Sequence, residues 1–119
     1  PWWEGAAGAV YLLPDAPWSR RVIGSFANEL AVAHPRRAHA VARRTADGAL
    51  VVSVRAPIDA PGGASDLCRR FGGAGRASAG GIDGLPEDRF EAFVHAFATT
   101  AWGERASADS PPSTGGRAR

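Results

Sequence analysis

The segment Ala38–Arg55, AHAVARRTADGALVVSVR, decides how this chain is expected to fold. Two runs of small and branched apolar residues flank Asp47-Gly48, and an Asp-Gly turn between such runs is a strong local signal for a β-hairpin. Because side chains alternate between the two faces of a strand, the second run turns Leu50, Val52 and Val54 to one face, and Val51, Ser53 and Arg55, which stands at the strand exit, to the other. The two predicted strands are 38–45 and 49–55.

Hydrophobic periodicity predicts a strand and a helix before this hairpin. The run 9–13, AVYLL, is short, branched and aromatic, and Pro14 ends it, which is typical of a buried strand. From Pro17 to His34 the apolar residues recur at three- and four-residue steps, as on one face of an amphipathic helix that ends before Pro35.

Three further elements are predicted after the hairpin. Residues 64–71 favour a short helix, with Ser65 as its cap and Cys68 directed inward. A glycine-rich segment then leads into a strand that runs to about Ile82. Phenylalanines at helical spacing predict a core helix over 86–102.

These elements define an α/β fold, with a mixed β-sheet of about four to five strands covered by about three helices. The 119 residues suffice for one domain, predicted over 1–102. Residues 103–119 are rich in Pro, Ser and Gly and poor in apolar residues, so they predict a disordered tail. The first residues lack an initiator methionine, and the chain is therefore expected to be a piece of a longer protein.

Composition excludes several classes of chemistry. All 14 basic residues are arginine, so neither a Walker-type phosphate loop nor a Schiff-base lysine is possible. Cys68 is the single cysteine, which rules out an intrachain disulfide and fits a cytoplasmic location. No apolar run approaches the roughly 18 residues of a membrane span, so no membrane partner is expected.

The glycine-rich segment 71–81, FGGAGRASAGG, is the part of the chain that carries chemistry. Glycines allow a ligand to approach backbone N–H groups, and successive N–H groups in a turn form an anion-binding concavity beside Arg76. The alternative is a tight turn in which glycine only relieves crowding between helix and sheet. The pattern alone leaves both interpretations open.

The order of these motifs resembles the DHHA1 domain of the DHH-family phosphoesterases. In that domain a strand ending in Ser-x-Arg leads through a short helix to a loop of the form Gly-Gly-Gly-His/Arg-x-x-Ala-Ala-Gly, and this chain has Ser53-Val54-Arg55 followed by residues 73–81. The stretch 14–30 also resembles one bacterial branch of the family. By this resemblance the substrate-binding residues are Arg55, Gly73, Ala74, Gly75, Arg76 and Ser78. Arg76 departs from the commoner histidine, and Ala74 from glycine.

The resemblance implies a module that binds the phosphate of a nucleotide or a short single-stranded nucleic acid. Hydrolysis would need Mn²⁺ held by a separate DHH catalytic domain, whose Asp-His-His motif this chain lacks. Residues 34–39, with two histidines, are interpreted as a solvated connection and not as a metal site. The chain is thus expected to have no cofactor and no catalytic residue of its own. The alternatives are a non-catalytic nucleotide- or nucleic-acid-binding module fused to another domain, and an interaction domain whose loop is only structural.

Overall fold

The predicted hairpin lies at the centre of a six-stranded sheet. The computed structural model describes residues 1–103 of the 119. Strands β3 (Ala38–Arg44) and β4 (Ala49–Arg55) pair antiparallel. Gly48 in the connecting turn has φ +85°, a conformation that glycine adopts without steric cost. The β-hairpin predicted from Asp47-Gly48 is thus confirmed.

The remaining strands extend this hairpin in both directions, in the order β1-β2-β3-β4-β6-β5. Strand β2 runs parallel to β3, and the other neighbours are antiparallel, so the sheet is mixed. A parallel pair needs a crossover, and α1 supplies it between β2 and β3. The other elements are β1 (Trp3–Gly5), β2 (Gly8–Leu13), α1 (Pro17–Ala33), α2 (Ala64–Arg69), β5 (Ala74–Gly75), β6 (Ala79–Pro86), the 3₁₀ turn η1 (Glu87–Arg89) and α3 (Phe90–Ala98).

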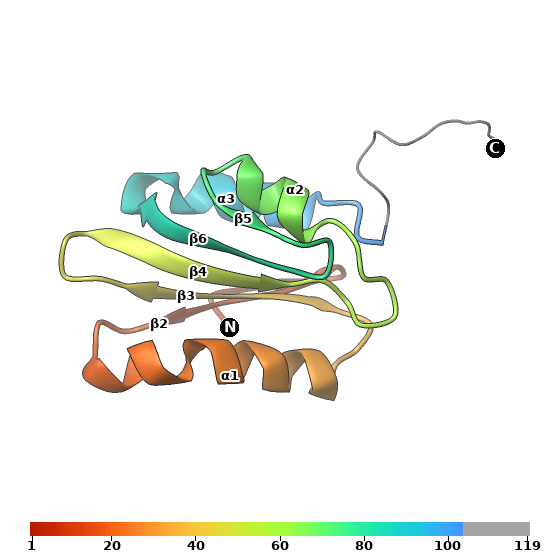
Figure 1. Ribbon diagram of the computed structural model, residues 1–119, viewed down its shortest axis with the longest axis horizontal. Helices are drawn as coiled ribbons and strands as arrows, with labels where there is room; N and C mark the ends of the chain where they lie inside the picture. The colour runs from red at the N-terminus through yellow and green to blue at the C-terminus, as the bar shows by residue number, and fades with distance from the viewer. Residues whose placement is uncertain (104–119) are drawn as a thin grey trace.

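Helices cover both faces of the sheet. Figure 1 shows α1 alone below the sheet, and α2 and α3 above it. The alternation of β4 divides its side chains between these layers. Leu50, Val52 and Val54 are buried in the core beneath α2 and α3, whereas Arg55 lies on the α1 side.

The core between the sheet and α2/α3 is large and aromatic. Phe93 and Phe97 are fully buried, and Phe93 packs edge-on against Phe71 with ring centroids 5.6 Å apart. Cys68 lies in this core, as predicted, and burial raises the pKa of its thiol to about 11. The thiol is therefore a packed apolar group and not a nucleophile at neutral pH.

The layer between the sheet and α1 is thinner. Its fully or nearly buried helix residues are the small Ser19, Ala27 and Ala31, while Phe26 is only partly buried against Tyr11 at a centroid distance of 5.4 Å. Small side chains bring the end of α1 close to the strands. This closeness allows a polar residue of the helix to reach the end of β4.

The sheet has six strands, where about four to five were expected. β1 has three residues and β5 two, and both pair at the ends of the sheet. Strands this short carry no alternation that sequence can show. The last helix also differs, because α3 spans Phe90–Ala98 after a 3₁₀ turn, and β6 continues to Pro86.

The start of α2 corrects a second expectation. Gly63, with φ +108°, precedes the helix, so Ser65 lies inside α2 and does not cap it. The prediction of a disordered tail concerns residues 104–119 almost entirely, which lie outside the described residues. Among residues 1–103, no helix is both long and apolar enough to cross a bilayer.

Candidate functional site

Arg55 ends β4 and turns toward the C-terminal half of α1. Its Nε donates a hydrogen bond to Oδ1 of Asn28 (2.9 Å), and its NH1 donates to the Val54 carbonyl oxygen (3.1 Å). A guanidinium carries five N–H donors, so three remain for another partner. The side chain is thus oriented by neutral groups on two elements, with most of its donors still available.

Arg76 reaches the same place from the turn between β5 and β6. The Arg76 N–H donates to the Ala79 carbonyl oxygen (2.7 Å), which closes the turn. Two backbone bonds then fasten the turn to the rest of the fold: the Ser78 carbonyl accepts from the Ala56 N–H (2.9 Å), and the Ala77 carbonyl accepts from the Ala64 N–H (3.0 Å). The turn is therefore held beside the exit of β4.

These segments surround one open pocket of about 360 Å³. Three of the predicted site residues, Arg55, Arg76 and Ser78, line it, although they lie far apart in the sequence. The other residues that line it are Asn28, Ala31, Val32, Ala56, Pro57, Ile58, Pro61 and Ala79. One wall is thus polar and positively charged, and the rest is aliphatic.

The electrostatics of the pocket favour an anion. Burial lowers the pKa of the Arg55 guanidinium, and the nearby charge of Arg76 lowers it further, although arginine stays protonated in proteins. Among residues 1–103, the ion pairs belong to Arg36, Arg37 and Arg44, so neither pocket arginine has a carboxylate partner there. Two adjacent guanidiniums repel each other, and a bound anion relieves that repulsion.

The glycines serve a different purpose from the one expected of a ligand cradle. The Gly73 N–H donates to the Cys68 carbonyl oxygen (2.8 Å), so it is not available to a ligand, and neither is the Arg76 N–H. A Cβ at Gly73 would overlap the Gly81 carbonyl, and one at Gly80 would lie 2.8 Å from the Cys68 sulfur. These glycines let β5, β6 and α2 approach closely. This supports the alternative interpretation of the segment, in which glycine relieves crowding between helix and sheet.

Gly73, Ala74 and Gly75 accordingly do not line the pocket, although sequence placed them in the site. Ala74 and Gly75 form β5 and pair with Gly81 and Gly80. The amides of Ala77 and Ser78, at the tip of the turn, have no hydrogen-bond acceptor within residues 1–103. The backbone donors that a ligand could use are therefore at the tip of the turn and not in the glycine run.

Asn28 is the site residue that the sequence did not reveal. It lies in the C-terminal half of α1 next to Glu29, and nothing in the helical pattern shows which polar residue meets the end of β4. The only signal was its place in the stretch 14–30 that resembles one family branch. The structure distinguishes it by its bond to Arg55.

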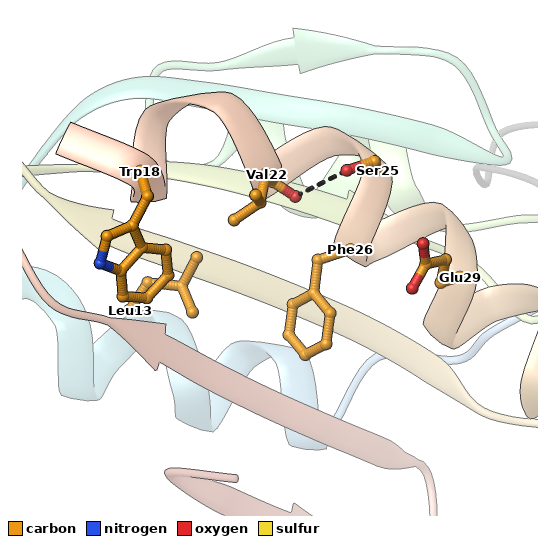
Figure 2. A pocket seen from close by; sticks show the side chains of 6 residues that line it. All are labelled: Leu13, Trp18, Val22, Ser25, Phe26 and Glu29. Atoms are coloured by element: carbon orange, nitrogen blue, oxygen red, sulfur yellow. Dashed lines mark hydrogen bonds between the residues drawn. The ribbon is translucent and has the colours of Figure 1, made fainter. Parts of the chain in front are cut away.

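A second pocket of about 420 Å³ lies between α1 and β2 (Figure 2). Its wall is mainly apolar, with Trp18, Val22 and Phe26 on one side, and the Ser25 hydroxyl donates back to the Val22 carbonyl (3.2 Å). Its charged group is the carboxylate of Glu29. Although slightly larger, this pocket has no cation to attract a phosphate.

Histidines and acidic residues do not assemble a metal site in the part of the chain that the structure describes: no three His, Cys, Asp or Glu side chains gather there. His34 is exposed, as expected of a solvated connection, but His39 is not. His39 is fully buried, neither ring nitrogen has a hydrogen-bond partner within residues 1–103, and burial with the charge of Arg37 lowers its pKa to about 4. The interpretation of 34–39 as solvated is wrong for this residue.

Comparison of the sequence with models of known protein families and with curated proteins finds no match. The geometry of the pocket and the resemblance in motif order are therefore the two indications of function.

Proposed function

We propose that this domain binds the phosphate group of a nucleotide or of the end of a short single-stranded nucleic acid, as the substrate-binding module of a DHH-family phosphoesterase. The observation that carries the proposal is the pairing of Arg55 and Arg76 in one pocket without a carboxylate partner among residues 1–103. Structural arginines of a folded surface commonly pair with acids. Here the neighbouring partners are the neutral amide of Asn28 and a backbone carbonyl.

Phosphate suits this geometry better than other anions. Arg55 keeps three N–H donors, Arg76 adds its own guanidinium, and Ser78 lines the same pocket. A terminal phosphate presents three acceptor oxygens and up to two negative charges, which matches two guanidiniums in both charge and number of bonds. The module would position the phosphate for attack, and the chemistry itself would belong to the manganese-bearing DHH domain.

The described residues offer no ligand set that fits manganese, so no catalytic step is assigned to them. A binding module fused to another domain remains the second candidate function, because the same observation supports it: the pocket provides phosphate recognition without its own metal ligands. The sequence of the full-length protein would distinguish the two candidate functions, since only the first requires an Asp- and His-bearing domain in the same protein.

Replacing Arg55 tests the proposal. Arg55→Ala removes charge-assisted hydrogen bonds of about 1.5–3 kcal/mol, so the affinity for adenosine 5′-monophosphate should fall about ten- to a hundredfold. The free energy of unfolding should change by less than about 1 kcal/mol, because Arg55 lies outside the hydrophobic core. Calorimetric titration of the chain at one fixed salt concentration measures the first quantity, and urea denaturation the second.

The matched control is Arg21→Ala. Arg21 is an exposed arginine on α1 outside this pocket and makes no ion pair within residues 1–103. If both variants weaken nucleotide binding equally, the positive surface attracts anions diffusely and the proposed site does not exist. A wild-type chain that binds no phosphate compound at all would refute the function itself.

A further inference from the structure

Two large apolar side chains stand exposed beside the arginine pair. Val32 is 71% exposed and Ile58 53% exposed, the two highest values among the large hydrophobic residues within 1–103 that remain uncovered. Single exposed apolar residues are common and need no explanation. These two, however, line the same pocket as Arg55 and Arg76.

The apolar wall belongs to the same elements as the polar one. Val32 follows Asn28 by four residues on α1, so both lie on one side of the helix. Ile58 follows Arg55 by three residues in the loop after β4, and Pro57 and Pro61 flank it in the pocket.

Backbone bonds hold this loop in place. The Asp59 N–H donates to the Pro35 carbonyl oxygen (3.2 Å), which ties the loop to the chain just after α1, and the Ala60 N–H donates to the Pro57 carbonyl (3.1 Å). The two apolar walls are therefore positioned relative to each other and to Arg55. Such a preformed aliphatic face costs little to organise when a ligand binds.

We infer that Val32 and Ile58 form a subsite for the nucleobase of a bound nucleotide, so the pocket selects a phosphate that carries a nucleobase over a bare phosphate, a phosphate chain or a sugar phosphate. This inference rests on the proposed function, because the arginines must hold the phosphate first. A phosphate chain is polar along its whole length and gains nothing from an aliphatic wall. A nucleobase has flat faces that lose hydration when they lie against one.

Three ligands separate the contributions of the phosphate and the nucleobase: adenosine 5′-monophosphate, ribose 5-phosphate and pyrophosphate, each titrated at the same salt concentration. The wild-type chain should bind the nucleotide at least about fivefold more tightly than ribose 5-phosphate. Val32→Ser and Ile58→Ser should each weaken nucleotide binding about three- to tenfold and change the affinity for ribose 5-phosphate less than twofold. Both side chains are largely exposed, so neither variant should impair folding.

Trp18→Ser is the control, because it removes an exposed apolar side chain from the same helix but outside this pocket. Its nucleotide affinity should equal that of the wild type. Equal binding of the nucleotide and ribose 5-phosphate by the wild type, or unchanged nucleotide binding in both serine variants, would overturn the subsite and leave the arginine site standing. Failure of all three ligands to bind would instead refute the proposed function, and the subsite with it.

Discussion

The two faces of the sheet are built in different ways. Against α2 and α3 the sheet buries large side chains, including Leu50, Phe93 and Phe97, at 0–1% exposure. Against α1 it buries small helix side chains and His39, and two arginines lie beside the C-terminal end of the helix. The first face contains the larger apolar core, and the second has smaller buried side chains beside the two arginines. Stability and binding should therefore respond to different substitutions.

The largest expected effect is a loss of stability caused by a substitution in the core between the sheet and α2/α3. Phe93→Ala should lower the free energy of unfolding by about 3–5 kcal/mol, because it removes a fully buried ring and leaves a cavity. Phe26→Ala on the α1 face should cost less than half as much, since Phe26 is only partly buried. Urea denaturation of both variants makes the comparison, and equal losses would show that the two faces contribute alike.

A second prediction concerns how stability depends on pH through His39 on the α1 face. The pKa of His39 is lowered from 6.5 to about 4 by burial, with the charges of Arg37 and His34 acting in the same direction. Between these pH values the unfolded chain binds a proton that the folded chain does not, so stability falls as the pH drops from 6.5 to 4. The total contribution is roughly 3 kcal/mol.

His39→Leu isolates this contribution, because the acidic residues titrate alike in both proteins. Chemical denaturation at several pH values should show a shallower loss of stability for the variant across this window. Parallel curves for the two proteins would mean that His39 is protonated in the folded state and that the α1 face is open to water.

The smallest expected effect is a change in nucleotide affinity when Asn28 of the proposed site is replaced. Asn28→Asp keeps an acceptor for the Arg55 Nε but adds a negative charge next to the proposed phosphate site, so nucleotide affinity should fall at least about tenfold. Asn28→Ala, which loses only one hydrogen bond, should lower it about two- to tenfold. Ala46→Asp, in the hairpin turn at the far end of β4, is the charge control for titration. Tighter binding by Asn28→Asp would contradict an anion site.

How much of the fold the sequence could predict depends on whether the deciding interactions are local or lie between distant segments. The alternation of β4 and its Asp-Gly turn are local, and the burial of Val52 and Val54 follows from them. Two-residue β5 carries no local pattern, and its pairing with β6 depends on glycines that permit close approach. The glycine run was ambiguous for the same reason, because close packing and ligand access both favour glycine.

For the site, the resemblance in motif order singled out Arg55 and Arg76, and the structure brings them to one pocket. Sequence could not single out Asn28, Val32 and Ile58. Their importance lies in where the end of α1 and the loop after β4 meet, which is a property of tertiary packing and not of any local segment.

Asn28, Arg55 and Arg76 come from a helix, a strand and a turn that only the folded sheet brings together. In the unfolded chain these residues are far apart, and no pocket exists. An anion that binds them therefore binds the native state alone, and by mass action it shifts the folding equilibrium toward that state. At a ligand concentration a hundred times the dissociation constant, the native domain gains about 2.7 kcal/mol. In a chain of this size, occupancy of the pocket would itself be a substantial part of what keeps the domain folded.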